Sequence, residues 1–461
     1  MTEPVFVPQE VIRKKRDRVP LSAAELTDFV RGTVSGAVGP SQIGAFTMAV
    51  YLNGMSEDER LAYTLAMRDS GRVIDWSEIG LSGPTIIDKH SSGGVGDEKV
   101  SLIVVPLVAA CGIHMPMISA RGLGHTGGEI DLLDAIPGYD TTPSTERFMQ
   151  VVAEVGGAII SPTPDLAPAD KPIFYIRDVA ATVESIPLIT GSIMSKKLAA
   201  GINGLVMTVP FGSGAFMPDV ARAEELAASL IGVAVGAGKP MVALISDLTE
   251  VLGDSIGSNN QLREVIDFLT GRYREPRLTE TVLALASETL LMGGLTETIE
   301  DGRRLALARL DDGAAADRFA KMVAALDGPA DLVDNPDRHL QRAQIIRPVF
   351  ADTPGTVASQ DCYAIGMAML RLGCGRTDPD ADIDHAVGLT GMASCGSTVG
   401  PDRPLCVVHA RSEAAFEAAA ADIRAAVVVR EPPVITTPPI VGRLAGKPAA
   451  DASATVERAA D

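Results

Sequence analysis

Three segments of the chain gather residues that could bind an anion or a polar substrate. The first, residues 88–97, reads Asp-Lys-His-Ser-Ser-Gly-Gly-Val-Gly-Asp and follows the apolar run Thr85-Ile86-Ile87. Glycines let backbone amides approach an anion closely, serines add hydroxyl donors, and Lys89 adds a positive charge. The segment is neither a Walker A loop nor a dinucleotide-binding Gly-x-Gly-x-x-Gly loop. We therefore predict a phosphate-type loop after a strand, with a plain glycine-rich turn as the alternative.

A second glycine cluster ends the next apolar segment. Residues 119–128 read Ser-Ala-Arg-Gly-Leu-Gly-His-Thr-Gly-Gly. In a parallel sheet, the loops at the carboxyl ends of neighbouring strands face one crevice. The two glycine clusters are therefore predicted to share one anion site.

The third segment has a helical pattern and spans residues 176–198. Ser192 and Lys196 are four residues apart, which places them on one face of a helix. Arg177 lies at the start of the same segment. For Lys197 we expect an ordinary solvated lysine, and Ser192 with Lys196 could be either a site or a solvated pair.

The elements that position these segments can be inferred from caps and apolar runs. Ser22 and Glu25 form a capping-box pattern, and Ser56 followed by three acidic residues opens another helix, so the first 70 residues are predicted to be helical. From about residue 83, short apolar runs alternate with glycine-rich turns and alanine-rich helices. That alternation is typical of an α/β domain with a largely parallel sheet.

The predicted fold class is α/β, with a small all-helical domain, a larger α/β domain and a small C-terminal α+β domain. The helical domain is expected to comprise residues 1–70 and 170–200. The α/β domain, with a mixed and largely parallel sheet, is expected to comprise residues 71–169 and 201–344. The α+β domain should cover 345–435, and the Pro- and Ala-rich tail, 436–461, is expected to be loose.

Composition excludes several classes of protein. The chain has 461 residues, with 59 acidic residues against 40 Lys and Arg, for a net charge of −19. Binding to nucleic acid or an anionic membrane over a broad face needs clustered cations, so neither partner is expected. A hydrophobic fraction of 46 % with 21 % charged residues indicates a globular protein.

Two further patterns bear on location and metals. The N-terminus lacks a secretory pattern, and Pro106 and Pro116 interrupt the apolar stretch 100–120, which we interpret as buried core and not as a membrane span. The five cysteines are odd in number and lack metal-ligand spacing. We expect reduced thiols, no zinc site and a cytoplasmic location.

Taken together, the three segments resemble the thymidine phosphorylase / pyrimidine-nucleoside phosphorylase family. The similarity runs from Gln9 to the region of Leu405 and includes the blocks Leu-Ala-Pro-Ala-Asp-Lys at 166–171 and Gly-Ser-Gly-Ala-Phe-Met-Pro at 212–218. The resemblance implies a pentosyltransferase of nucleoside salvage. It would catalyse reversible phosphorolysis of pyrimidine (deoxy)nucleosides such as thymidine, giving free base and (2-deoxy)ribose 1-phosphate. A homodimer, inorganic phosphate as co-substrate and no resident cofactor are also implied.

The resemblance also implies roles for single residues in a cleft between the helical and α/β domains. Lys89, Ser91, Ser101 and Ser119 fall on phosphate-contacting positions, and His90, Arg177, Ser192 and Lys196 fall on positions that hold the pyrimidine. His90, Arg177 and Lys196 would be catalytic, since the leaving base develops negative charge that cations and a hydrogen-bond donor stabilise. We expect Lys89, Arg121, Arg177 and Lys196 to converge on this one cleft inside an acidic shell.

The sequence departs from the family pattern most sharply at Glu129, where the family has a threonine that contacts phosphate. A carboxylate about 4 Å from one phosphate charge costs roughly 4 kcal/mol at an effective dielectric near 20. That corresponds to an affinity loss on the order of a thousandfold.

Two other departures lie near the site. Residues 98–101 are one residue longer than in the family pattern, and Thr208-Val209-Pro210 replaces Asp-Val-Lys. Some members of the family bind a monovalent cation. The matching positions here are Gly96, Leu252, Ser255 and Glu264, and the longer segment argues against occupancy.

Glu129 leaves three hypotheses open. It could pair with Lys99 or rotate away, leaving an ordinary phosphorylase. It could recruit a cationic group on a modified nucleoside, or activate water as a general base and make the enzyme a nucleoside hydrolase. A binding paralogue without turnover and a phosphoribosyl-transferring enzyme are further alternatives. Base preference and ribose against 2-deoxyribose stay open.

Overall fold

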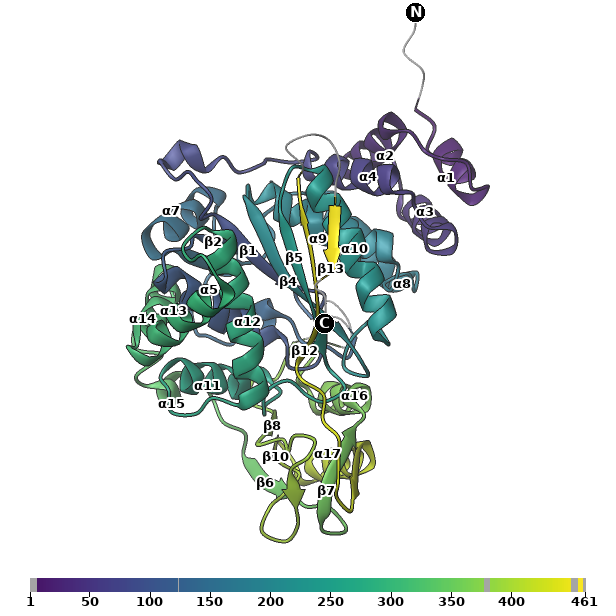
Figure 1. The fold of residues 1–461 in the computed structure, drawn as a ribbon. Helices are drawn as coiled ribbons and strands as arrows, with labels where there is room; N and C mark the ends of the chain where they lie inside the picture. Colours follow the sequence, from purple (N-terminus) through teal and green to yellow (C-terminus); the bar gives the residue numbers. More distant parts are fainter. Residues whose placement is uncertain (1–5, 123, 377–381, 449–454, 459–461) are drawn as a thin grey trace, which may run out of the picture.

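The computed structural model describes residues 6–122, 124–376, 382–448 and 455–458. Four helices open the chain and form a bundle at the upper right of Figure 1. They are α1 (Pro8–Arg16), α2 (Ala23–Ser35), α3 (Pro40–Asn53) and α4 (Glu57–Arg68). Both predicted helix starts carry a capping box, with the Ser22 hydroxyl accepting from the Glu25 amide and the Ser56 hydroxyl from the Glu59 amide. The bundle therefore begins its helices where the sequence predicts.

Two later helices pack on this bundle. In α8 (Asp170–Val179), Ile173 joins the apolar cluster of the bundle, and in α9 (Ile186–Ala199), Leu188 does the same. The approach of α9 to α4 is close, because a Cβ at Gly191 would lie 2.7 Å from the Tyr63 ring. The other side of α9 packs against α10 (Val220–Gly236), so α9 connects the bundle to the α/β domain.

A mixed, mainly parallel sheet forms the centre of the molecule (Figure 1). Its order is β1 (Ile87–Ser91), β4 (Gly204–Phe211), β5 (Met241–Asp247), β12 (Ile440–Lys447) and β13 (Thr455–Arg458). The first three strands are parallel, and β12 adds antiparallel to β5. Beside β1, a parallel bridge from Ile86 to His114 leads to the parallel pair β2 (Met115–Ile118) and β3 (Gly157–Ile160).

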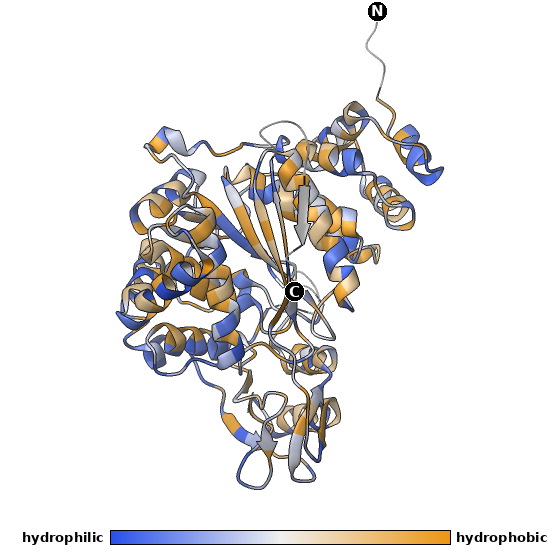
Figure 2. Cartoon of the chain, in the orientation of Figure 1, coloured by the Kyte–Doolittle hydropathy of each residue, from blue (hydrophilic) through white to orange (hydrophobic). Residues whose placement is uncertain are grey.

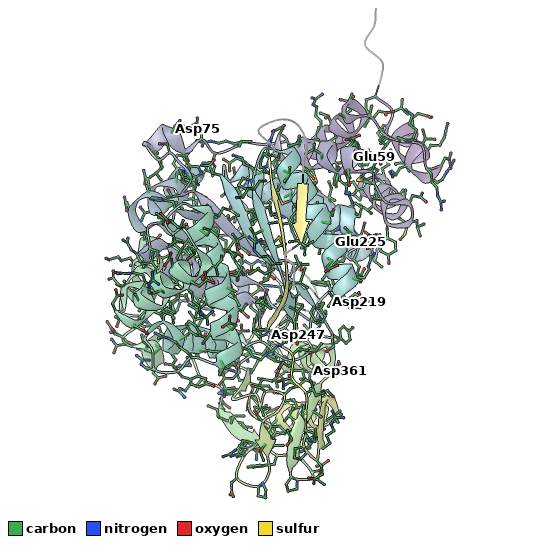
Figure 3. All side chains as sticks on the ribbon, viewed as in Figure 1. Glu59, Asp75, Asp219, Glu225, Asp247 and Asp361 are labelled. Atoms are coloured by element: carbon green, nitrogen blue, oxygen red, sulfur yellow. The ribbon has the colours of Figure 1, made fainter. Side chains whose placement is uncertain are left out.

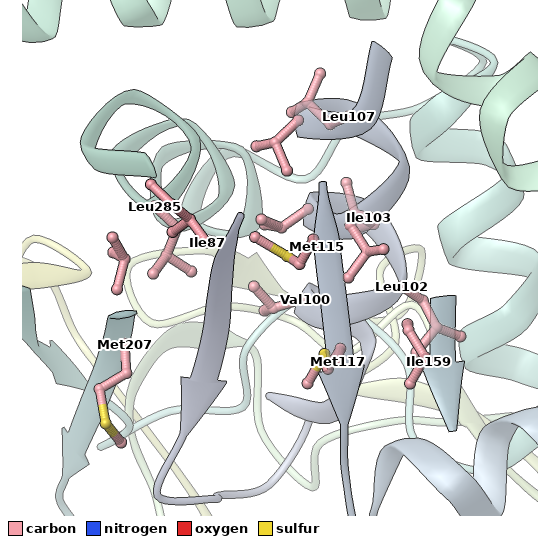
Figure 4. Packing of buried hydrophobic residues seen from close by; sticks show 14 of the residues in the cluster. Ile87, Val100, Leu102, Ile103, Leu107, Met115, Met117, Ile159, Met207 and Leu285 are labelled. Carbon is pink, nitrogen blue, oxygen red and sulfur yellow. The ribbon is translucent and has the colours of Figure 1, made fainter. Parts of the chain in front are cut away.

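Helices cover the sheet and bury its apolar side chains. One flank carries α5 (Glu98–Ala110), α7 (Thr145–Val155), α11 (Ser258–Leu269), α12 (Pro276–Met292), α13 (Ile299–Asp311) and α14 (Ala314–Ala325). The short helices η1 (Trp76–Ile79), α6 (Glu129–Leu133) and α15 (Pro336–His339) lie in the connections. Figure 4 shows Ile87 of β1 and Met115 of β2 packed with Val100 and Ile103 of α5. In Figure 2 the central strands are mainly apolar, and the outer helices of this flank mix hydrophilic with apolar residues.

The C-terminal domain lies below the sheet in Figure 1. It contains β6 (Ile345–Val349), β7 (Gly355–Gln360), α16 (Cys362–Leu372), β8 (Gly388–Thr390), β9 (Thr398–Val399), β10 (Cys406–Ala410), α17 (Glu413–Ala426) and β11 (Val427–Arg430). Its strands form two small sheets, β6-β10-β8 and β11-β7-β9. The Asp361 carboxylate caps the start of α16 by accepting from the Ala364 amide at 3.0 Å (Figure 3). In the α/β domain, Asp219 caps α10 in the same way.

Two predictions about segments are wrong. The tail after residue 436 is not loose throughout, because Ile440–Lys447 forms β12 and Leu444 pairs with Ala243 of β5. The edge of β5 opposite β4 offers backbone hydrogen bonds to β12, which the Pro- and Ala-rich composition of the tail does not reveal. Likewise, Lys89, His90 and Ser91 belong to strand β1 and not to a loop. Within the described residues, no helix is long and apolar enough to cross a membrane.

Candidate active site

A cavity with about 820 Å³ of empty space, including its open mouth, lies between the end of β1, the 119–129 segment and helices α8 and α9. Side chains alternate along β1, so Asp88 and His90 face α9 while Lys89 and Ser91 face α5. Most of the residues singled out from the sequence line this cavity. They are His90, Ser91, Ser119, Arg121, Glu129, Arg177, Ser192 and Lys196.

One end of the cavity holds a chain of hydrogen bonds that ends on Glu129. Lys89 Nζ donates to Ser101 Oγ at 3.0 Å, and Ser101 Oγ donates to Glu129 Oε1 at 2.8 Å. Ser119 Oγ donates to the other carboxylate oxygen at 2.7 Å. Lys89 and Ser101 are fully buried and do not line the cavity, so the Glu129 carboxylate lies between them and the open space. The expected partners of phosphate therefore converge, and here they bind a carboxylate.

Ser91 lies at the same end but is held differently. Its hydroxyl accepts from the Gly93 amide at 3.1 Å, which fixes the turn that follows β1. The nearby Asp97 is buried, and burial raises the pKa of its carboxyl. Ser91 therefore lines the cavity at the end of β1, with its hydroxyl held by the Gly93 amide and the Asp97 carboxyl.

The opposite end presents cations from the two helices. Arg177 of α8 donates to Leu188 O at 3.2 Å and to Val183 O at 2.6 Å, and its buried Nε has no hydrogen-bond partner among the described residues. Lys196 of α9 donates to Ser192 Oγ at 3.1 Å and pairs with the buried Asp170. Burial lowers the pKa of both Arg177 and Lys196. Two desolvated positive charges of this kind suit a ligand on which negative charge develops.

His90 lies between the two ends. Burial, reinforced by the charges of Lys197, Lys89 and Lys196, lowers the pKa of His90 well below 6.5. The imidazole is therefore neutral at neutral pH. Its buried Nδ1 has no hydrogen-bond partner within the described part of the chain, so the imidazole keeps one unused hydrogen-bonding position there. A neutral imidazole can donate one hydrogen bond and accept another.

Comparison with known proteins identifies the family. Residues 9–71 match the helical bundle domain and residues 83–316 the a/b domain of the glycosyl transferase family, and residues 356–430 match the pyrimidine nucleoside phosphorylase C-terminal domain. The thymidine phosphorylase of Burkholderia cenocepacia (strain HI2424) is 52 % identical over 427 residues, 93 % of this chain and 97 % of that protein. The chain belongs to the thymidine phosphorylase family. The thymidine phosphorylase of Burkholderia lata gives the same identity and coverage.

A solved structure outside the thymidine phosphorylase family shares the fold. The crystal structure of anthranilate phosphoribosyltransferase from Thermus thermophilus aligns with a TM-score of 0.56 and 20 % identity. It covers 68 % of this chain and 99 % of its own. This likeness concerns the fold alone.

Two buried ion pairs were not predicted from the sequence. Lys197, expected in solvent, is fully buried and donates to Asp88 Oδ2 at 2.8 Å and to Ile118 O at 2.9 Å. Burial raises the pKa of Asp88, an effect that the Lys197 charge opposes. Asp170, the partner of Lys196, lies in the block 166–171 that carries the family resemblance. In the sequence, both Asp88 and Asp170 directly follow apolar residues. A carboxylate that is buried among apolar residues needs a cation as its partner, and this pattern could have indicated the two pairs.

Two charged residues have partners that were not predicted. Arg121 lines the cavity as expected, and its guanidinium pairs with Asp134 and lies 3.4 Å from Asp131, so two carboxylates already offset its charge. Lys99 does not pair with Glu129. Its ammonium donates to Leu252 O, Ser255 O and Glu264 Oε2, three of the positions that the family resemblance assigns to a monovalent cation. A metal ion does not fit there while the lysine holds these oxygens.

Proposed function

We propose that the chain catalyses the reversible phosphorolysis of thymidine to thymine and 2-deoxyribose 1-phosphate. The observation that carries the proposal is 52 % identity over 93 % of the chain to proteins named thymidine phosphorylase. The cavity supports it, because hydroxyl donors lie at one end and buried cations at the other, as a nucleoside with an anionic co-substrate requires.

The proposed reaction assigns a task to each end. A phosphate oxygen attacks C1′ of the sugar, the bond between C1′ and N1 of the base breaks, and its electron pair leaves with the base. Arg177 and Lys196 stabilise the negative charge that develops on the pyrimidine, with Ser192 hydrogen-bonding beside them. His90 donates a hydrogen bond as a neutral imidazole. Lys89, Ser91, Ser101 and Ser119 position the phosphate.

Glu129 has to move for phosphate to reach Ser101, because its carboxylate occupies both serine hydroxyls. This same observation favours a second candidate, hydrolysis, in which Glu129 activates a water molecule at C1′. The two reactions give different sugar products. Phosphorus NMR of thymidine incubated with the enzyme and inorganic phosphate should show a sugar 1-phosphate resonance equimolar with thymine. Free 2-deoxyribose without that resonance would refute the phosphorylase proposal and support hydrolysis.

We also propose a homodimer through the helical domain. The outer surfaces of α3 and α8, which pack on each other, expose large apolar side chains: Met48, Tyr51, Leu52, Tyr175 and Val179. Leu52 is 68 % and Val179 71 % exposed, and large apolar side chains gathered on two packed helices favour an interface there. A reducing compartment such as the cytoplasm suits the five free cysteines of the chain.

A further inference from the structure

A buried ammonium joins two segments beside the active site. Lys99, the second residue of α5, is 0 % exposed. Its Nζ donates to Leu252 O at 3.0 Å, to Ser255 O at 2.7 Å and to Glu264 Oε2 at 2.6 Å. The two carbonyls belong to the connection between β5 and α11, and the carboxylate belongs to α11 itself. An ammonium has three N–H donors, so this arrangement uses all of them.

The three acceptor oxygens, from Leu252, Ser255 and Glu264, form a site of the kind that binds a hard cation. We call this site the oxygen cradle. Backbone carbonyls and a carboxylate are the ligands such ions prefer, and a lysine ammonium is a compact point charge. Glu264 is itself fixed, because its Oε1 accepts from the Asp254 amide at 3.0 Å and its Oε2 accepts from the Ser255 hydroxyl. The cradle is therefore preformed around one positive charge, which Lys99 supplies.

The cradle lies next to the phosphate end of the cavity. Ser101, two residues after Lys99, contacts both Lys89 and Glu129. The turn before α5 also approaches the same connection: a Cβ at Gly96 would lie 2.5 Å from Leu252 O. The Lys99 ammonium thus holds the first turn of α5, with Ser101, against residues 252–255.

We propose that the Lys99 ammonium takes the place of a bound monovalent cation, so that the enzyme does not depend on potassium. The lysine is a positioning residue that acts through Ser101 and does not touch the substrate. The kinetic part of this inference rests on the proposed phosphorolysis, and the structural part does not. Removing the side chain should leave the cradle empty and open to a free cation of similar size, such as potassium or ammonium.

The test compares the wild-type enzyme, Lys99→Ala and a control, Lys321→Ala, whose exposed lysine on α14 pairs with Asp317. Phosphorolysis rates and melting temperatures are measured in potassium chloride and in tetramethylammonium chloride at equal ionic strength. Wild type and control should behave alike in both salts. Lys99→Ala should lose about 10- to 100-fold in kcat/KM in tetramethylammonium, as for the loss of a group that orients a metal ligand. Potassium should restore most of that loss and raise the melting temperature with its concentration, as expected for a ligand of the folded state.

Two results would overturn the proposal. One is a wild-type enzyme that loses activity or melting temperature when potassium is removed. The other is a folded Lys99→Ala variant whose rate and melting temperature do not respond to potassium. If Lys99→Ala folds in neither salt, the activity and melting temperature of the wild-type enzyme in the two salts decide the proposal. If wild type shows no phosphorolysis at all, the proposed function fails, and the melting temperatures still decide whether the cradle binds a cation.

Discussion

Glu129 is the residue on which phosphate binding depends. Its carboxylate accepts hydrogen bonds from Ser101 and Ser119, which are the hydroxyls that phosphate would use. Phosphate must displace this side chain and then lie near its negative charge. Replacing Glu129→Thr should therefore lower the KM for phosphate by about tenfold or more, given that a charge pair at contact distance costs roughly 4 kcal/mol at intermediate dielectric.

The control variants separate charge from shape. Glu129→Gln keeps the size of the side chain and should show much of the same decrease in KM. Glu225→Gln removes an exposed carboxylate of α10 that pairs with Arg222, and it should leave the KM unchanged (Figure 3). Saturation kinetics with phosphate at fixed thymidine measures all three. A KM for phosphate that rises in Glu129→Thr would contradict this prediction, because it would mean that the carboxylate assists phosphate binding.

The lowered pKa of His90 should make the free energy of unfolding depend on pH. Burial, reinforced by neighbouring lysines, lowers the pKa of His90 well below 6.5, so the folded state keeps the imidazole neutral while the unfolded chain protonates it near pH 6.5. The unfolded state then binds more protons, and the free energy of unfolding decreases as the pH falls through about 6.5. Urea unfolding of wild type and His90→Gln at several pH values checks this. The decrease should be smaller in the variant, and identical pH profiles would contradict the assignment.

At the scale of elements, β12 extends the central sheet beyond β5. Leu444 in this strand is 4 % exposed and belongs to the main apolar cluster, whereas Val441 of the same strand is 38 % exposed. Leu444→Ala should therefore destabilise the protein by about 2–5 kcal/mol, as for other buried leucines. Val441→Ala should change stability by less than about 1 kcal/mol. Thermal unfolding of both variants tests whether β12 is part of the core, and equal effects would contradict it.

Elements with local signals were predictable from the sequence. The helices after Ser22 and Ser56 begin at the predicted caps. A capping box involves only four consecutive residues, so it can be recognised from the local sequence. Strand β1 was misplaced, since Asp88, Lys89 and His90 are atypical of a buried strand. Their burial depends on distant partners, namely Lys197 for Asp88 and Ser101 for Lys89. Such pairs form only in the folded chain, so no local pattern reports them.

For the whole molecule, the three domains were expected from the sequence. Capping patterns predicted the helical bundle, and the alternation of apolar runs with glycine-rich turns predicted the α/β domain. The site residues could be named because five ordered blocks resemble one family. What sequence could not supply is the partner of each charge: Glu129 on two serines, Lys99 in a cradle of oxygens, and Arg121 between Asp131 and Asp134. These follow from how distant segments pack.

The proposed dimer can be tested on the intact protein. Light scattering after gel filtration should give twice the chain mass of 48.1 kDa. The double substitution Leu52→Asp and Val179→Asp should shift the mass to that of one chain, because it buries two charges in the apolar contact. Ile435→Asp, at an exposed position outside the helical domain, is the matched control and should stay dimeric. A wild-type mass of one chain would refute the dimer.

In the proposed reaction, phosphate and not water accepts the sugar from the base. The most direct measurement is the rate of thymine release from thymidine as inorganic phosphate is varied, starting from enzyme freed of phosphate. We predict no release above background without phosphate and a rate that rises to saturation as phosphate is added. Release at the full rate in the absence of phosphate would contradict phosphorolysis and support hydrolysis.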